Sequence, residues 1–198
     1  GRTLDGRSGR SALGRLGLKP FTLGPKEGLA LINGTQAMTA VGVALCLDAR
    51  DLLVQADVVG AMSLEALRGT DAAFSERAMR LRPHPGQAAS AANLRRLLAH
   101  SPIHASHRDC GRVQDAYSLR CMPQVHGAAR DAMAFVEEVL LRESNAVTDN
   151  PVIFPNGVVS CGNFHGEPVA MALDLAAIAI SEIGALSERR TARLVDHD

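Results

Sequence analysis

Residues 28–47 read GLALINGTQAMTAVGVALCL and contain no charged side chain. As a helix, this segment is long enough to cross a bilayer. It nevertheless carries Asn33, Thr35, Gln36 and Thr39, and it has an acid at each end instead of a basic flank. A helix that is apolar on all sides is also typical of the centre of a large helical bundle. We therefore expect residues 28–47 to lie in a helical core and not in a membrane.

Outward from this segment, the pattern predicts further helices joined by polar connections. The first long helix is expected over residues 25–68, with a break near residues 48–51 or at Gly60. Other helices are expected within residues 1–25 and over residues 86–99, 124–142 and 167–194. The sequence around residues 152–160 is compatible with a short β-hairpin turned by Asn156-Gly157. The predicted fold class is all-α.

The composition agrees with helices and argues against several classes of protein. Aromatic residues make up 3% of the chain, which disfavours sheets. Lys+Arg and Asp+Glu are 21 each, so nucleic acid is not expected as a partner. The 4 cysteines include no Cys-x-x-Cys pair, which argues against a zinc ribbon. The first residues, GRTLDGR, show no apolar signal segment, and we expect a cytoplasmic protein with free thiols.

The most apolar helices have little amphipathic pattern, so each needs partners on every side. A chain of 198 residues cannot easily cover both of them. This argues for a larger chain or an oligomer.

Polar side chains concentrate between Arg112 and Gly127. If this segment makes one or two helical turns, Gln114, Tyr117 and Arg120 share a face. An amide, a phenol and a guanidinium can together form a carboxylate site, because an arginine can hold a carboxylate through two hydrogen bonds. The alternative is an interface loop with an ordinary hydrogen-bond network.

Other polar features have a structural and a functional interpretation. The loops over residues 143–151 and 162–168 either line a site or close turns and cap helices. Asn33, expected inside an uncharged helix, needs a hydrogen-bond partner, either in the core or in a site. His104, His107 and Cys110 have metal-like spacing. No further ligand completes the set, so hydrogen-bonded or solvated histidines are the preferred interpretation.

A set of motifs in this sequence resembles those of the aromatic amino acid ammonia-lyase family. The motifs are GPKEGLALINGTQ at 24–36, VQDAYSLRCMPQ at 113–124, ESNAVTDNP at 143–151, GNFHGEP at 162–168 and LSERR at 186–190. They occur in the family's order and span nearly the whole chain. Within the family, Ser118 and CMPQVHG at 121–127 are more similar to the members that act on histidine than to those that act on phenylalanine or tyrosine.

The resemblance implies long antiparallel helices in a bundle with polar active-site loops, assembled as a homotetramer with shared active sites. It implies the elimination of ammonia from L-histidine to give trans-urocanate. The β-proton of histidine is not acidic and an amine leaves poorly, so the family uses an electrophile. This is a methylidene-imidazolone group, made autocatalytically from an internal Ala-Ser-Gly triplet, and no metal is implied.

The same resemblance suggests roles for individual residues. Tyr117 matches the essential tyrosine, which reaches the electrophile from a neighbouring subunit, and Arg120 matches the arginine that holds the substrate carboxylate. Asn33 matches a catalytic asparagine that hydrogen-bonds the electrophile or helps to form it. The other implied site residues are Gln114 and Asn150, which line the site, and Phe164, which packs near the prosthetic ring.

The sequence departs from the family in one respect, because it contains no Ala-Ser-Gly triplet. We expect the segment with the triplet upstream of Gly1 and a C-terminal segment beyond Asp198. Residues 1–198 would then be the central part of a single helical domain, and inactive alone. The alternatives are a catalytically inactive truncated protein that only oligomerises, a lyase for phenylalanine or tyrosine, and an unrelated metal-binding protein.

Overall fold

The computed structural model describes residues 1–107 and 110–196, and these residues form two compact units. We call Thr35–Thr148 with His165–Asp198 the bundle unit, and Gly1–Gly34 with Asp149–Phe164 the hairpin unit. Over the described residues the fold is all-α with one short hairpin, as predicted.

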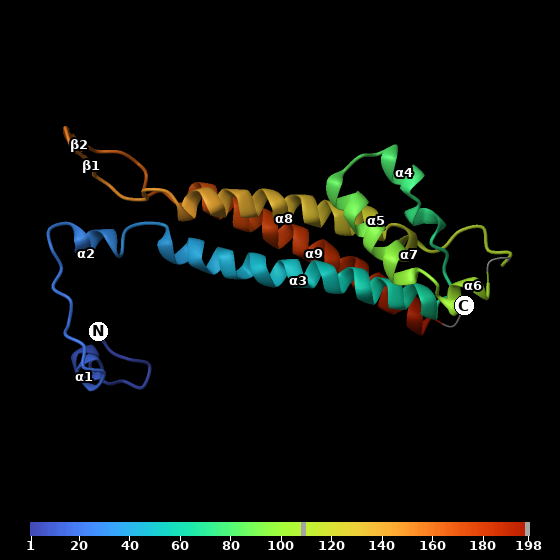
Figure 1. The fold of residues 1–198 in the computed structure, drawn as a ribbon, viewed down its shortest axis with the longest axis horizontal. Helices are drawn as coiled ribbons and strands as arrows, with labels where there is room; N and C mark the ends of the chain where they lie inside the picture. Colours follow the sequence, from blue (N-terminus) through green and yellow to red (C-terminus); the bar gives the residue numbers. More distant parts are fainter. Residues whose placement is uncertain (108–109, 197–198) are drawn as a thin grey trace. The chain divides into compact units, whose positions relative to one another are not determined.

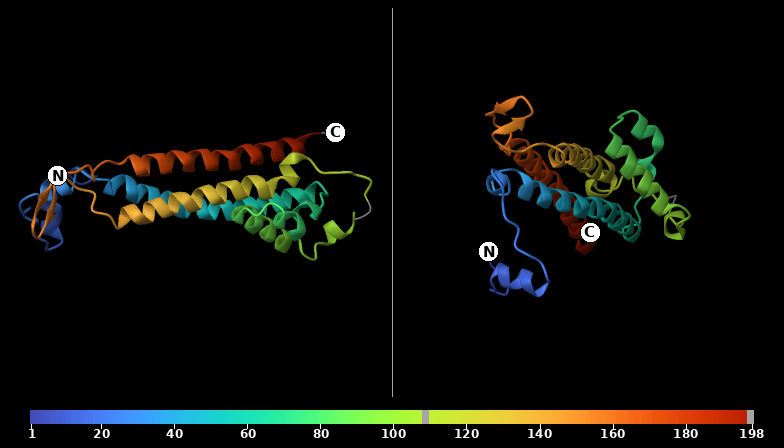
Figure 2. Two further views of the ribbon diagram at one scale, coloured as in Figure 1. Left: turned by 90° about the horizontal axis from the view of Figure 1, so that it is seen from above. Right: turned by 60° about the vertical axis from the view of Figure 1, so that its left-hand side comes forward.

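Long helices build the bundle unit. They are α3 (Gln36–Ala66), α5 (Pro85–Leu98), α8 (Met122–Ser144) and α9 (Glu167–Val195). Helices α3, α8 and α9 lie side by side, with α8 antiparallel to the other two (Figure 1, Figure 2). Shorter elements connect them: η1 (Ala72–Phe74), α4 (Glu76–Arg80), α6 (Pro102–Ala105) and α7 (Tyr117–Arg120). The helices predicted over residues 86–99, 124–142 and 167–194 are therefore confirmed.

The core of the bundle unit has a part between the long helices and a part around α7. Between α3, α8 and α9 the buried side chains include Leu53, Met133, Val136, Leu140 and Ile183. Around α7, Leu119 is buried together with Leu64, Leu94 and Met122, which come from α3, α5 and α8. Burying an aliphatic side chain of this size contributes about 1.5–3 kcal/mol. The second part of the core fixes α7 on the ends of the long helices.

Helix α3 differs from its prediction in its continuity and in the residue at which it begins. It runs from Gln36 to Ala66 without interruption, so the break predicted near residues 48–51 or at Gly60 is wrong. Gly60 is buried, and a Cβ there would collide with the Sδ atom of Met122. This glycine lets α3 pack closely on the start of α8, and it does not break the helix.

The start of α3 also lies later than predicted. The chain first forms α2 (Glu27–Ala30) and then a turn over residues 31–35. Asn33 lies in this turn and is exposed. The prediction that Asn33 sits inside a helix is therefore wrong, and its amide does not need a partner in the core.

The hairpin unit contains α1 (Gly9–Arg15), α2, β1 (Val152–Phe154) and β2 (Gly157–Val159). The strands are antiparallel, with Val152 opposite Val159 and Phe154 opposite Gly157. The predicted hairpin is confirmed, but its turn is Pro155-Asn156 and not Asn156-Gly157. Pro155 suits the turn better than a strand, because proline has no N–H to donate to the strand pair.

Within residues 1–107 and 110–196, α9 is the one helix long and apolar enough to cross a membrane, judged by length and composition alone. The core helix of a bundle passes the same test. Val169, Ala172, Ala179 and Ile183 of α9 are buried against α3 and α8. The segment at residues 28–47, which first suggested a span, is instead divided by the turn before α3.

Candidate active site

Helix α7 is a single turn that presents Tyr117 outward and Leu119 inward. The backbone N–H groups of Arg120 and Cys121 donate to the carbonyl oxygens of Ala116 and Tyr117, at 3.1 and 2.9 Å. Leu119 is buried, whereas the Tyr117 side chain is 73% exposed. The core thus fixes the backbone of the turn and leaves the phenol accessible.

Arg120 lies beside Tyr117. Its Cζ atom is 4.6 Å from the centroid of the Tyr117 ring, which is a cation–π contact. The Nε atom of Arg120 and the Oε1 atom of Gln124 are buried, and neither has a hydrogen-bond partner among the described residues. A buried donor or acceptor without a partner costs about 1–3 kcal/mol. Such a donor beside an exposed phenol fits a site completed by a polar ligand with a carboxylate.

Gln114 does not share the helical face predicted for it. The helix begins at Tyr117, and Gln114 precedes it in an irregular, exposed segment. There it lines a polar pocket together with Arg68, His104, His107 and Asp115. The structure therefore brings together Tyr117 and Arg120 but places Gln114 in another group of side chains.

His107 lies between two backbone carbonyl groups. Its Nδ1 atom is 2.6 Å from the carbonyl oxygen of Ile103, and its Nε2 atom is 3.0 Å from that of Gly69. The Nε2 atom of His104 lies 3.4 Å from Oδ1 of Asp71. Among the described residues, no group of three or more His, Cys, Asp or Glu side chains could hold a metal ion. This geometry gives the metal-binding alternative no support.

Asn33, Asn150 and Phe164 belong to the hairpin unit. Asn150 precedes β1, and its Oδ1 atom accepts hydrogen bonds from the backbone N–H of Cys161 at 2.6 Å and from the Ser160 hydroxyl at 3.4 Å. Its side chain thus closes the base of the hairpin. Phe164 is 39% exposed at the end of the segment after β2.

An ion pair ties the start of α2 to the base of the hairpin. Lys26 donates to the carboxylate of Asp149, and the backbone N–H of Asn150 donates to the same side chain at 2.7 Å. These hydrogen bonds, chiefly the one from Lys26, hold the pKa of Asp149 below its usual value. These contacts fix Asp149 and Asn150 at the base of the hairpin.

A buried polar network that the sequence analysis missed joins α3, α5, α8 and α9. Asp57 of α3 is 1% exposed and accepts hydrogen bonds from His126 Nδ1 at 2.8 Å, Arg130 Nη2 at 2.6 Å and Asn93 Nδ2 at 3.0 Å. Arg190 Nη1 lies 3.4 Å from His126 Nε2. Because a guanidinium can only donate, His126 accepts at Nε2 and donates from Nδ1.

Burial alone would raise the pKa of Asp57. The hydrogen bonds from His126 and Asn93 and the charge of Arg130 outweigh burial, so this pKa lies below its usual value. Burial lowers the pKa of Arg190, and the Asp57 carboxylate partly opposes that shift. The network thus holds an ionised carboxylate in the core next to the first turns of α8, which follow α7 directly.

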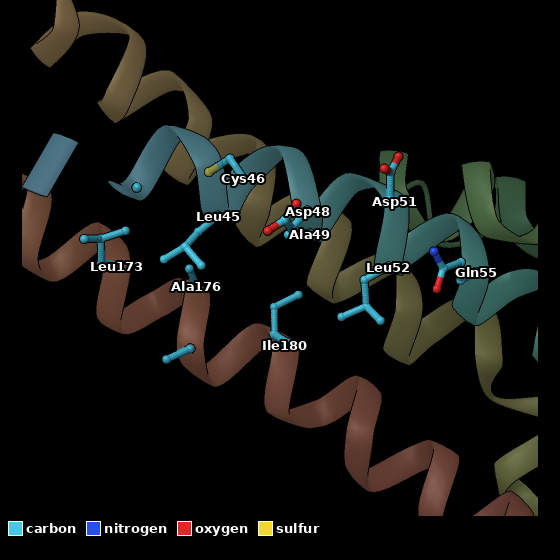
Figure 3. Close-up of a pocket in the computed structure, with 12 residues that line it drawn as sticks. Leu45, Cys46, Asp48, Ala49, Asp51, Leu52, Gln55, Leu173, Ala176 and Ile180 are labelled. Atoms are coloured by element: carbon cyan, nitrogen blue, oxygen red, sulfur yellow. The ribbon is translucent and has the colours of Figure 1, made fainter. Parts of the chain in front are cut away.

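An apolar groove runs along α3 and α9, as Figure 3 shows. Its lining side chains include Leu45, Leu52, Leu173, Ala176 and Ile180, with Asp48 and Asp51 among the polar ones. Further large apolar side chains are exposed on these helices, among them Val41, Leu47, Val54, Met62, Met171 and Ile178. An apolar surface of this kind is typical of a protein–protein contact.

The family model for the aromatic amino acid lyases matches residues 4–198. The chain belongs to the aromatic amino acid lyase family. The resemblance seen in the sequence motifs is therefore confirmed.

Curated relatives within the aromatic amino acid lyase family include histidine ammonia-lyases. The enzyme of Sorangium cellulosum is 59% identical over 192 residues, which cover 93% of this chain and 37% of the relative. The enzyme of Koribacter versatilis is 56% identical over 203 residues, which cover 96% of this chain and 39% of the relative. The chain thus spans well under half the length of these relatives.

Solved structures of a histidine ammonia-lyase and of a tyrosine aminomutase share the fold. The histidine ammonia-lyase of Trypanosoma cruzi superposes with a TM-score of 0.85 at 45% identity, covering 98% of this chain and 37% of that one. The tyrosine aminomutase of Streptomyces globisporus gives a TM-score of 0.87 at 37% identity, covering 94% of this chain and 39% of that one. The fold is therefore common to proteins whose names state different reactions.

Proposed function

We propose that residues 1–198 are the central part of a histidine ammonia-lyase, which converts L-histidine into trans-urocanate and ammonia. The observation that carries this proposal is the graded sequence identity. It is 51–59% to curated histidine ammonia-lyases. Among solved structures it is 45% to the histidine ammonia-lyase of Trypanosoma cruzi, against 37% to the tyrosine aminomutase and 32% to a yeast phenylalanine ammonia-lyase. The TM-scores of these structures are similar, so sequence and not shape supports histidine as the substrate.

The proposed roles follow from the chemistry of each side chain. Arg120 holds the substrate carboxylate, for which its buried Nε atom supplies a donor in need of an acceptor. Tyr117, which is an exposed residue, moves a proton through its hydroxyl. A methylidene-imidazolone group, contributed by residues outside this sequence, supplies the electrophile.

Other residues of this chain would surround that group and the substrate. Asn33 would hydrogen-bond the group and Phe164 would pack beside it. Gln114 and Asn150 would line the same site. The exposure of Asn33 and Phe164 supports such contacts, whereas Gln114 and Asn150 are proposed from their match to the family's motifs alone. No metal takes part in the proposed reaction.

Arg120→Lys is expected to weaken substrate binding more than it slows turnover. Lysine keeps the positive charge but loses the planar pair of donors that matches a carboxylate. In the complete polypeptide of the reading frame that contains residues 1–198, we expect KM for histidine to rise about tenfold or more, with kcat changed less. Steady-state kinetics measure both parameters. A fall in kcat at constant KM would contradict the carboxylate role.

The proposed partner is further copies of the same chain, in a homotetramer with shared active sites, where Tyr117 serves the electrophile of a neighbouring subunit. The apolar groove and the exposed apolar side chains of α3 and α9 support this, because they need a cover that the described residues do not provide. We propose that the enzyme is cytoplasmic and has no nucleic-acid or membrane partner.

The experiment that tests the function is a substrate comparison on the complete polypeptide. L-histidine, L-phenylalanine and L-tyrosine are supplied separately, and ammonia and the unsaturated acid are measured. Histidine is expected to be the preferred substrate by kcat/KM. A higher kcat/KM for phenylalanine or tyrosine would show that histidine is not the substrate. Stable oligomers that release no ammonia would favour the alternative of an inactive protein.

A further inference from the structure

Asp115 is a buried carboxylate that lies two residues before Tyr117. Its Oδ2 atom accepts a hydrogen bond from the backbone N–H of Thr70 at 2.7 Å. Its Oδ1 atom lies 3.4 Å from Nη1 of Arg112, and the same Nη1 donates to the carbonyl oxygen of Leu67 at 3.1 Å. Asp115 thus joins the segment before α7 to the turn that follows α3.

The turn that receives Asp115 is itself firmly held. The N–H of Gly69 donates to the carbonyl oxygen of Leu64 at 2.8 Å, and the Gly69 carbonyl oxygen lies 3.0 Å from Nε2 of His107. A Cβ at Gly69 would lie 2.6 Å from Cδ1 of Leu64 and 3.0 Å from Oδ2 of Asp115. A glycine at position 69 is therefore needed for the Asp115 carboxylate to approach the backbone of this turn. Asp115 thus binds to a turn that is itself fixed at the end of α3.

The position of the Tyr117 phenol depends on the backbone around it. The side chain is 73% exposed, and its ring contacts the Arg120 guanidinium, which belongs to the same turn. On the C-terminal side, buried Leu119 and Met122 hold the turn. On the N-terminal side, the hydrogen bonds of Asp115 hold it.

We propose that Asp115 is a positioning residue, which fixes the start of α7 and so places the Tyr117 hydroxyl for proton transfer. This inference rests on the proposed function, because it concerns the reaction assigned to Tyr117. Asp115 acts through the backbone, since its own carboxylate is buried and occupied by Thr70 and Arg112. A displacement of a reacting group by about 1 Å can slow an enzyme by about a hundredfold.

The chain offers a matched control in Asp131. Its Oδ1 atom accepts a hydrogen bond from the backbone N–H of Gly86 at 2.7 Å, and it ties α8 to the start of α5. The bond has the same donor and acceptor types and the same length as the bond from Thr70 to Asp115. Both bonds also join residues 45 apart in the sequence. Replacing Asp131 therefore shows how the loss of such a hydrogen bond affects activity when the bond lies in another part of the bundle unit from Tyr117.

The test compares Asp115→Ala, Asp115→Asn and Asp131→Ala in the complete polypeptide. We expect Asp115→Ala to lower kcat roughly ten- to a hundredfold. KM should change within about threefold, because Arg120 stays held by the core side of the turn. Asp115→Asn should lie between Asp115→Ala and wild type, since an amide oxygen can still accept from Thr70. Asp131→Ala should lower Tm while kcat stays at the wild-type value.

Hydrogen exchange supplies a readout that does not require activity. Asp115→Ala should speed exchange at the amides of Arg120 and Cys121, because their acceptors, the carbonyl oxygens of Ala116 and Tyr117, lie on the side of the turn that Asp115 holds. Asp131→Ala should not change exchange at these amides. Wild-type kcat in Asp115→Ala, or unchanged exchange at these amides, would overturn the positioning role. If the wild-type protein forms no urocanate, the proposed function is refuted instead. Hydrogen exchange at the amides of Arg120 and Cys121 would then still show whether Asp115 fixes the start of α7.

Discussion

Tyr117→Phe is expected to lower kcat of the complete enzyme by about a hundredfold or more, because a positioned proton-transfer group contributes about 10²–10⁴ in rate. The substitution removes one oxygen from a side chain that is 73% exposed. The ring remains, so the guanidinium of Arg120 keeps its contact at 4.6 Å from the ring centroid. Burial in the core does not change, and we expect a Tm near the wild-type value.

Steady-state kinetics and a thermal melt of the same preparation measure the two effects of Tyr117→Phe. Glu76→Gln is the control, because Glu76 pairs with Arg80 on the exposed surface of α4. Loss of an exposed pair costs about 0–1 kcal/mol and should leave kcat unchanged. If Tyr117→Phe raises KM and leaves kcat intact, Tyr117 binds substrate but does not move its proton.

Asp57→Asn is expected to cause the largest loss of stability, about 3–5 kcal/mol, because removing one partner of a buried ion pair leaves the other charge uncompensated. Asp57 is 1% exposed and accepts from His126, Arg130 and Asn93. Arg190 carries a second buried positive charge in the same network. Denaturant unfolding of the complete protein measures the loss. The control is Glu137→Gln, which removes a more exposed pair with Arg50 and should cost about 1 kcal/mol or less.

The loss in Asp57→Asn should depend on pH. The folded-state pKa of Asp57 lies below the reference value of 3.8. A carboxylate with a depressed pKa stabilises the fold above its unfolded pKa, and this stabilisation disappears as the pH falls through the folded pKa. The difference between wild type and Asp57→Asn should therefore be full near neutral pH and shrink below about pH 4. A difference that stays constant down to pH 2 would show that the carboxylate charge is not the cause.

The helices were predictable where a helical pattern began at a proline. Pro85 and Pro168 stand in the first turns of α5 and α9, and both helices match their predictions closely. The predicted breaks in α3 failed for a physical reason. Charged Asp48 and Asp51 lie on the exposed face of a continuous helix, and Gly60 serves a close helix contact. Whether a glycine or a charged residue breaks a helix can be decided only when the elements that pack against it are known.

The contact between Tyr117 and Arg120 follows from their spacing of three residues on a helical turn. Gln114 fell outside the turn because α7 is shorter than the polar run suggested. The Asp57 network could not be predicted from spacing, since its members come from α3, α5, α8 and α9. The available signal was an acid inside an otherwise apolar helix, next to Ala56 and Val58. An acid in that position needs buried partners.

Urocanate formation from L-histidine tests the central claim most directly. The assay compares the complete polypeptide with the 198-residue chain alone, at equal concentration and with intact masses verified. We expect the complete polypeptide to form urocanate and ammonia in equal amounts. We expect the 198-residue chain to form none, because Tyr117 and Arg120 then lack an electrophile. Urocanate from the pure 198-residue chain, or none from the complete polypeptide, would contradict the account.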